Sequence, residues 1–356
     1  MVYSFKYYSS AIQFILKKAF VFFKKLFSDK DYYEEEIKKE NLVLTEAAKK
    51  LNIEVIDHQG GMQEFRYNKQ RTFIKGNATE IESAVSHKIA GDKYLVSQLL
   101  SEKGLPVPVS RCFLSSLIEE AIEYFIQNDY PVVVKPCRGT SGGVGVTAGV
   151  DSIKDFKKAF YEASFYDQYV LIEQFIVGEN IRLLILDKVF LSAVRRIPGY
   201  VVGDGKNTIK TLIKKTNHQR ENSTNYPKLW PILINNDLQI TLRRKNVNLR
   251  SVPPENKKIF IKTICNGHQG GIVEEVTKNT HSDYIQLCIK ALEICKVKFG
   301  GVDIITNDIS KPISQAGGFI NEINTTPSFY GHYQAINRDE IQDVAGKFFR
   351  YIFDID

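Results

Sequence analysis

Two apolar segments near the C-terminal end carry polar residues where the interior of a β-sheet is expected. GGVDIIT covers residues 300–306 and GFINEINTTP covers 318–327. Asp303 is flanked by valine and isoleucine, and Glu322 and Asn324 project from the same face of a strand because they are two residues apart. An acid in a buried strand is costly unless it is paired or bound to a metal. Two carboxylates and an amide oxygen suit Mg²⁺, so these residues predict a metal site; the alternative is a pair of solvated edge-strand acids.

A glycine-rich stretch, VVVKPCRGTSGGVGVTAGV, covers residues 132–150. Lys135 ends an apolar, β-branched run, and the loop after it can turn several backbone N–H groups into one concavity that grips phosphate. The stretch is not a Walker A motif, whose lysine follows the glycines, nor a dinucleotide fingerprint, which opens a helix. Taken alone, it is more typical of a flexible hairpin.

The segment VLIEQFIVGENIRLLIL, residues 170–186, reads as a strand, a short linker and a second strand. The backbone of the linker, residues 173–176, can hydrogen-bond an adenine while its apolar side chains flank the ring. Arg182 and the adjacent pair Arg195 and Arg196 supply cations nearby that can stabilise a transferring phosphoryl group. Because neighbours on a strand point to opposite faces, only one of the pair should face the site.

Strand and helix patterns alternate along most of the chain, which indicates an α/β (α+β) protein. We expect an N-terminal helix and charged linker at 1–40, a small α/β region at 41–90, a unit with the glycine-rich loop at 91–170 and a metal-binding unit at 171–356. The polar segment 217–256 is expected to be an irregular insertion, and residues 339–353 a final helix.

Charge and cysteine content narrow the functional class. The net charge is +7, but the basic residues look dispersed, which disfavours a nucleic-acid partner. The five scattered cysteines form no CxxC pair and fit a reducing cytoplasm. Residues 11–27 are apolar but interrupted by four lysines, which predicts an amphipathic helix and not a membrane span. Its apolar face is expected to pack on this protein or on a second subunit of a homo-oligomer, with a membrane surface as the alternative.

The order of these motifs, together with RRIPGYVVGDGKNTI at 195–209, resembles the ATP-grasp ligases, in particular the ATP-grasp module of cyanophycin synthetase and of the bifunctional glutathione synthetases. The resemblance covers about Val55 to Tyr333. It implies an ATP-grasp fold, in which ATP lies between two α/β subdomains under a glycine-rich lid. It also implies that a carboxylate attacks the γ-phosphate of ATP and that an amine then displaces phosphate from the acylphosphate.

The resemblance assigns roles to individual residues. Lys93 and Lys135 would hold the phosphates, and Arg182 and Arg195 would face the acylphosphate. Either Glu179 or Asn180 would hold the ribose. The remaining implied residues are the lid (Gly139, Thr140, Ser141, Gly142, Gly143 and Gly145), the adenine linker (Glu173, Gln174, Phe175 and Ile176) and the ligands of two Mg²⁺ ions, or of Mn²⁺ as an alternative (Asp303, Glu322 and Asn324).

Departures from the family pattern bear on the substrate. Relatives read close to NLSTGG where this chain has NGHQGG, whose Asn266, Gly270 and Gly271 are expected on the substrate side. No Mur-ligase-like or glutamate–cysteine ligase domain is recognisable, so a complete version of either relative's activity is not expected. We therefore predict an amide-forming ligase that acts on an amino acid or peptide. The alternatives are a catalytically silent ATP-binding regulatory or scaffold protein, and a kinase that stops at the acylphosphate.

Overall fold

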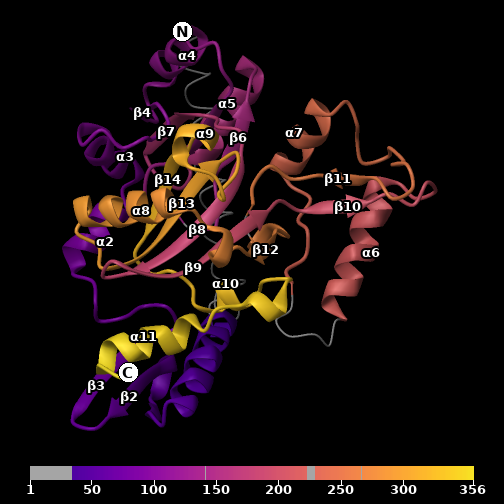
Figure 1. The fold of residues 1–356 in the computed structure, drawn as a ribbon. Coiled ribbons are helices and arrows are strands. Elements are labelled where there is room, and N and C mark those ends of the chain that lie inside the picture. Colours follow the sequence, from indigo (N-terminus) through magenta and orange to yellow (C-terminus); the bar gives the residue numbers. More distant parts are fainter. Residues whose placement is uncertain (1–33, 141, 223–228, 266) are drawn as a thin grey trace.

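The computed structural model describes residues 34–140, 142–222, 229–265 and 267–356. The expected helix at 11–27 lies outside these residues. Four sheets are described, and every pairing between their strands is antiparallel (Figure 1). The mixed α/β fold class expected from the sequence is confirmed.

The N-terminal region packs against the end of the chain. A helix over 34–50 is followed by a three-stranded sheet, β1 (Glu54–Asp57), β2 (Met62–Tyr67) and β3 (Gln70–Lys75). These elements share one apolar cluster with α11 (Val344–Phe353), in which the Phe65 and Phe349 rings lie 4.7 Å apart. The final helix was expected from residue 339, but it begins at Val344 because Asp343 caps its first turn by accepting from the Gly346 amide.

A four-stranded sheet carries the glycine-rich loop. Its strand order is β4 (Ser110–Leu114), β7 (Tyr169–Gln174), β5 (Val132–Pro136) and β6 (Thr147–Val150). Helices α4 (Ile118–Gln127) and α5 (Ile153–Ser164) pack on it through a buried cluster that includes the stacked rings of Phe125 and Phe156. The loop after Pro136 joins the central strand β5 to the edge strand β6, so its base is held by the sheet.

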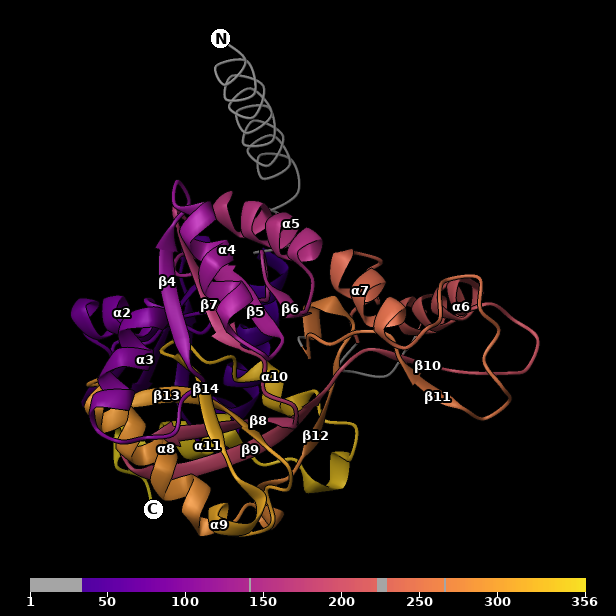
Figure 2. The same ribbon diagram turned by 90° about the horizontal axis from the view of Figure 1, so that it is seen from above.

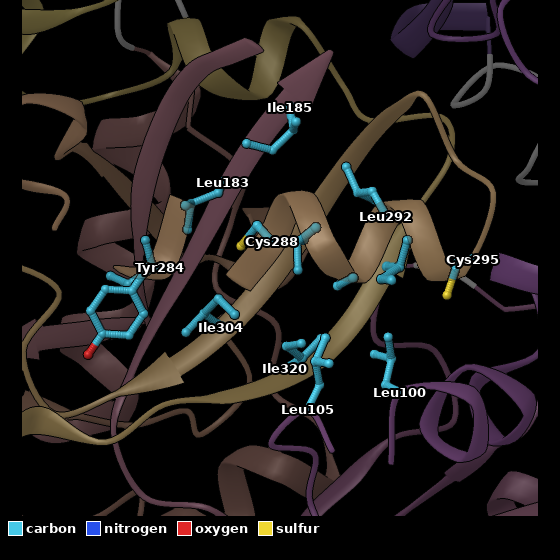
Figure 3. Close-up of a cluster of buried hydrophobic side chains, with 14 of the residues drawn as sticks. Leu100, Leu105, Leu183, Ile185, Tyr284, Cys288, Leu292, Cys295, Ile304 and Ile320 are labelled. Carbon is cyan, nitrogen blue, oxygen red and sulfur yellow. The ribbon is translucent and has the colours of Figure 1, made fainter. Parts of the chain in front are cut away.

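A five-stranded sheet of order β12-β9-β8-β13-β14 lies beside the four-stranded sheet. The strands are β8 (Glu179–Leu186), β9 (Val189–Ile197), β12 (Ile272–Glu275), β13 (Phe299–Thr306) and β14 (Phe319–Asn324). Figure 3 shows side chains of α8 (Ser282–Ile294) pointing into one buried cluster with those of the strands, among them Leu183, Ile304 and Cys288. Leu100 of α3 (Lys93–Glu102) belongs to the same cluster. Each such side chain contributes about 1.5 to 3 kcal/mol on burial.

An arm between β9 and β12 departs from the sequence expectation. It contains β10 (Tyr200–Val202), α6 (Ile209–Glu221), α7 (Asn236–Arg244) and β11 (Lys258–Phe260), around its own apolar cluster. Residues 217–256 are therefore not simply irregular, because α7 lies among them. Polar composition concealed this helix, because buried polar residues, Asp237 and Thr241, lie among its buried apolar ones. The remaining short helices are α2 (Ala84–Ala90), α9 (Ile313–Ala316) and α10 (Tyr330–Tyr333).

Candidate functional site

Strand register brings the predicted metal ligands onto one face of the five-stranded sheet. Asp303 of β13 is directly opposite Glu322 of β14, and Gly301 is opposite Asn324. Directly opposed residues of antiparallel strands project from the same face, and Glu322 and Asn324 share a face because they alternate with Ile323. The register shifts between Asp303 and Ile304, immediately beside the acid. The three residues singled out from sequence are thus neighbours in space.

Asp303 is the centre of a buried ion cluster. Arg182, opposite it on β8, donates from Nε to Oδ1 at 2.6 Å and from its terminal nitrogen to Oδ2 at 2.7 Å, while Arg196 donates to Oδ2 at 3.0 Å. Burial alone raises the pKa of the Asp303 carboxyl, but the two guanidinium groups outweigh it and hold that pKa below its ordinary value. The acid is therefore ionised at neutral pH.

The arginine pair on β9 is oriented differently from the sequence expectation. Arg195 was expected beside the acylphosphate, but Arg196 is the one that reaches Asp303. Arg195 lies on the opposite face, where it contacts Glu274 at 2.6 Å and Glu179 at 3.2 Å. The alternation rule was right that only one of the pair faces this cluster. Which one depends on the register with β8, and there Arg196 is opposite Asn180.

Two lysines approach the same face from outside the sheet. Lys93, the first residue of α3, lies 3.5 Å from Glu322 Oε1. Lys135 of β5 and Glu173 of β7 form a buried pair at 3.0 Å. Burial tends to lower the pKa of Lys135, but Glu173 more than compensates and raises it, so the lysine stays cationic. A small pocket is lined by Lys93, Glu173 and Glu322, so residues of three elements meet there.

The glycine-rich loop has the backbone conformation for which glycine is needed. Gly139, Gly142, Gly143 and Gly145 have φ of 70°, 67°, 74° and 72°, a region that other residues rarely adopt. A side chain on Gly145 would also strike Pro136 and Tyr166. The carbonyl of Thr140 lies 3.5 Å from Lys93 Nζ, so the loop bends toward the site. Ser141 lies outside the described residues.

The predicted adenine linker connects the two large sheets. The Gln174 amide donates to the carbonyl of Val109 and the Phe175 amide donates to that of Pro131, while Ile176 is half-buried. Glu179 is held by Arg195, whereas Asn180 lies on the Arg182 side of β8. The structure therefore separates the two residues that the sequence left open for the ribose.

The segment NGHQGG meets the glycine-rich loop through a residue that sequence reasoning did not single out. Gln269 Nε2 donates to the carbonyls of Gly142 at 3.4 Å and Gly143 at 3.3 Å. Its Oε1 accepts from Lys262, whose side chain is fully buried and also contacts Asn235 at 2.5 Å. Since a buried lysine needs partners, its presence in the apolar stretch KKIFIKTI was the available signal.

The three substrate-side residues expected in this segment have different positions. Asn266 lies outside the described residues. Gly270, with φ of 91°, packs so closely on Ile232 of the arm that a side chain would lie 2.5 Å from the Ile232 Cα. Gly271 is buried just before β12. The two glycines join the arm to the sheet.

Sequence reasoning also did not find a buried hydrogen-bonded chain of three polar side chains, Ser192, Glu275 and His332. Ser192 Oγ donates to Glu275 Oε2 at 3.2 Å and contacts His332 Nδ1 at 2.9 Å. Burial lowers the pKa of His332 to about 3, and the Arg182 and Arg196 charges act in the same direction. The imidazole is therefore neutral at neutral pH.

The residues present suit a hard divalent cation. Asp303 and Glu322 supply carboxylate oxygens and Asn324 an amide oxygen, a donor set typical of Mg²⁺. The buried Nδ2 atom of Asn324 has no hydrogen-bond partner among the described residues, so protein contacts do not hold this end of the amide. No group of three or more His, Cys, Asp or Glu side chains suitable for a metal occurs in the described part of the chain, so the amide would have to complete this set. The chemistry of the three residues fits the predicted metal.

Comparison with known proteins shows what the chain is similar to. Residues 99–202 match the family model described as the D-ala D-ala ligase C-terminus. Cyanophycin synthetase of Trichormus variabilis is 30% identical over 283 residues, which are 79% of this chain and 31% of that protein. The glutathione biosynthesis bifunctional protein GshAB of Mannheimia succiniciproducens is 27% identical over 326 residues, 88% of this chain and 42% of that protein. The chain thus spans less than half the length of these relatives.

Among solved structures, the bifunctional glutathione synthetase from Pasteurella multocida superposes with a TM-score of 0.58 at 24% sequence identity, covering 88% of this chain and 43% of that one. In the described residues, no helix has both the length and the apolar character needed to span a bilayer. The family match over residues 99–202 and the relatives show that the chain is homologous to part of cyanophycin synthetase and of GshAB, and the fold agrees with the resemblance to the ATP-grasp ligases.

Proposed function

We propose that this protein is an ATP-dependent ligase that joins the carboxylate of an amino acid or peptide to an amine through an acylphosphate, with release of ADP and phosphate. The observation that carries the proposal is that charged side chains of the five-stranded sheet lie next to a lysine of helix α3. Arg182, Asp303 and Glu322 lie on one face of the five-stranded sheet, and Lys93 reaches that face from α3 at 3.5 Å from Glu322. The names of the relatives, a cyanophycin synthetase and a glutathione biosynthesis protein, support amide formation as the reaction class.

Phosphate binding is assigned to Lys93, Lys135 and the glycine-rich loop. Lys135 is held at a fixed position by Glu173, and its raised pKa keeps it cationic while phosphate oxygens compete for it. The loop residues with positive φ can present N–H groups toward the same phosphates. The linker at residues 173–176 is the adenine site, and Asn180, unlike Glu179, is not held by an arginine and is our choice for the ribose.

Asp303, Glu322 and Asn324 would hold Mg²⁺, or Mn²⁺ in its place. When bound, such an ion neutralises phosphate charge and aligns the γ-phosphoryl group. Arg182 and Arg196 are the protein's own contribution, because their guanidinium groups are already fixed by Asp303. Preformed cations need no reorganisation when charge develops on the reacting oxygens.

The proposed reaction has two steps. A carboxylate oxygen of the acid attacks the γ-phosphorus, and the bond from that phosphorus to the ADP oxygen breaks. The amine then attacks the acyl carbon, phosphate leaves with the electron pair of the carbon–oxygen bond, and the amine loses a proton to solvent. Arg182 and Arg196 are suited to stabilise the negative charge that both steps place near the acyl group.

A matrix of amino acids and dipeptides as acids and amines, assayed for ADP and phosphate release, tests the proposal. Turnover should need Mg²⁺ and stop with a chelator, and hydroxylamine should trap the activated acid as a hydroxamate. Lys135→Met serves as the inactive control. If folded protein binds ATP with Mg²⁺ but releases no ADP with any pair, the ligase is refuted and the silent ATP-binding alternative is favoured.

Cellular setting and assembly remain proposals. The cysteines at 112, 137, 265, 288 and 295 are all free, which supports a reducing compartment such as the cytoplasm. Light scattering of the full chain, compared with a variant that lacks residues 1–30, tests whether the N-terminal segment forms a homo-oligomer. The same two proteins mixed with liposomes test the membrane alternative.

A further inference from the structure

The arm at residues 200–262 carries all of the net positive charge of the chain. It contains thirteen Lys and Arg against four Asp and Glu, a formal charge of +9, whereas the chain as a whole carries +7. The other 293 residues therefore carry a net charge of −2. These basic residues form no continuous tract, so they look dispersed in the sequence, but they are concentrated in this one structural unit.

Six of these charges are not used to hold the arm together. Among the described residues, six basic side chains of the arm are exposed and form no ion pair: Lys206, Lys210, Lys214, Lys245, Arg250 and Lys257. The arm's stability comes instead from its own apolar cluster, which includes Val201, Ile213 and Ile261. Like charges at this density oppose folding, so their presence calls for a partner.

Backbone contacts gather four of these side chains at one end of the arm. The Ile209 amide donates to the Ser251 carbonyl at 2.9 Å, and the Gly203 amide donates to the Lys257 carbonyl at 2.8 Å. The turn that holds Lys206 and the start of α6 with Lys210 therefore lie beside the returning segment with Arg250 and Lys257. Figures 1 and 2 both show β10, β11 and α6 extending away from the larger sheets, so this end is open to a large partner.

The arm is attached to the site on both sides. It leaves β9 after Arg196 and returns to β12, whose Ile272 pairs with Ile197. At its base Arg243 contacts Asp155 of α5 at 2.7 Å and Arg244 contacts Asp151 at 3.4 Å. A chain bound along the arm would thus be led toward the arginines that flank Asp303.

The exposed chemistry favours an acidic polypeptide over a nucleic acid. Bases are bound on exposed aromatic rings, but no Phe, Tyr or Trp side chain is exposed in the part of the arm that the structure describes. Tyr200 and Phe260 pack together at 5.8 Å and lie under Lys258. A small acid, in turn, would need no surface this far from the site.

We propose that the basic arm is a docking surface for an acidic polypeptide, whose carboxylate the neighbouring site then ligates. The docking half of this inference stands on charge and shape, and the ligation half rests on the proposed function. Binding and turnover are therefore measured separately.

Binding is measured with the full chain and no ATP, by fluorescence anisotropy of a labelled twelve-residue Asp/Glu peptide. The arm variant changes Lys206, Lys210, Arg250 and Lys257 to Gln, and the matched control changes four exposed lysines elsewhere, Lys49, Lys50, Lys103 and Lys154, to Gln. Because four weak, exposed contacts are lost together, the arm variant should raise Kd about tenfold. The control should change Kd less than about twofold, and added salt should weaken wild-type binding.

Three further probes decide the partner class: a neutral Asn/Gln peptide of equal length, a twelve-nucleotide single-stranded RNA, and vesicles with anionic phosphatidylglycerol. The proposal expects the acidic peptide to bind with the lowest Kd. Tighter binding of RNA or vesicles, or equal effects of the arm and control variants, overturns it. ADP release with free amino acids but no peptide binding would reject the arm and keep the ligase, whereas peptide binding without any ADP release would do the reverse.

Discussion

Replacing Asp303 by Asn should weaken the fold as well as the proposed chemistry. The carboxylate accepts hydrogen bonds at 2.6, 2.7 and 3.0 Å from Arg182 and Arg196, and it is 6% exposed. Asn keeps the volume but removes the charge, which leaves two guanidinium groups facing each other. Breaking a buried ion pair by removal of one partner costs about 3 to 5 kcal/mol. Because a domain is stable by about 5 to 15 kcal/mol, the variant should fold with a clearly lower unfolding midpoint.

Urea unfolding followed by circular dichroism measures this loss, and Arg196→Gln in the Asp303→Asn background provides the matched test. Removing one guanidinium relieves the repulsion, so the double variant should recover part of the loss and show coupling between the two sites. The acid's depressed pKa stabilises the fold above its ordinary pKa, and that stability is lost as pH falls through the lower folded value. An Asp303→Asn midpoint equal to that of wild type would refute the ion cluster, and unchanged Mg²⁺-dependent turnover would refute the ligand role.

Three other changes have defined outcomes. Gln269→Glu keeps an oxygen for Lys262 but removes the donor to the loop glycines. Limited proteolysis should therefore cut the loop faster, and KM for ATP should rise about threefold to tenfold. An unchanged cleavage rate would contradict the contact. Burial raises the pKa of Glu40 to about 7, so as pH rises the unfolded chain loses this proton before the folded protein does. The free energy of unfolding should therefore fall by about 2 to 4 kcal/mol between pH 4.5 and 8. Glu40→Gln should make the free energy of unfolding, measured by urea titration, depend less on pH, and an unchanged dependence would contradict the assignment. Lys135→Met leaves Glu173 buried without its cation, so the protein should be less stable, and ATP binding measured by calorimetry should weaken at least about tenfold. Adding Glu173→Gln to this variant should restore the stability but not the ATP affinity.

Local patterns were sufficient to find the metal-ligand candidates. Glu322 and Asn324 share a face because of the two-residue period of a strand, and that period holds in any sheet. The acid in GGVDIIT was recognisable because a charge between β-branched residues needs a partner. The glycines of the loop were recognisable for a similar reason, since their positive φ is a property of single residues.

Local patterns could not predict which face of the sheet a strand residue points to, or which distant strands pair. The sequence showed that only one of Arg195 and Arg196 could face the cluster, but the choice of Arg196 follows from its position opposite Asn180 on β8. The contact of Gln269 with the loop joins residues more than 120 positions apart, and no local pattern encodes it. The helix α7 was hidden because polar residues, Asp237 and Thr241, are buried in it beside the apolar ones.

The sequence by itself was enough to predict the main strands, the glycine-rich loop and the candidate metal ligands Asp303, Glu322 and Asn324. It was also enough to show the likeness to the ATP-grasp ligases. These depend on interactions within a few residues, or on residue order along the chain. Only the tertiary structure decided that Arg182 and Arg196 neutralise Asp303, that Lys93 meets Glu322, and that the two ends of the basic arm segment lie side by side. The physical reason is that Coulomb energy and hydrogen bonding depend on distance in space, which strand register and packing set and which separation along the chain does not.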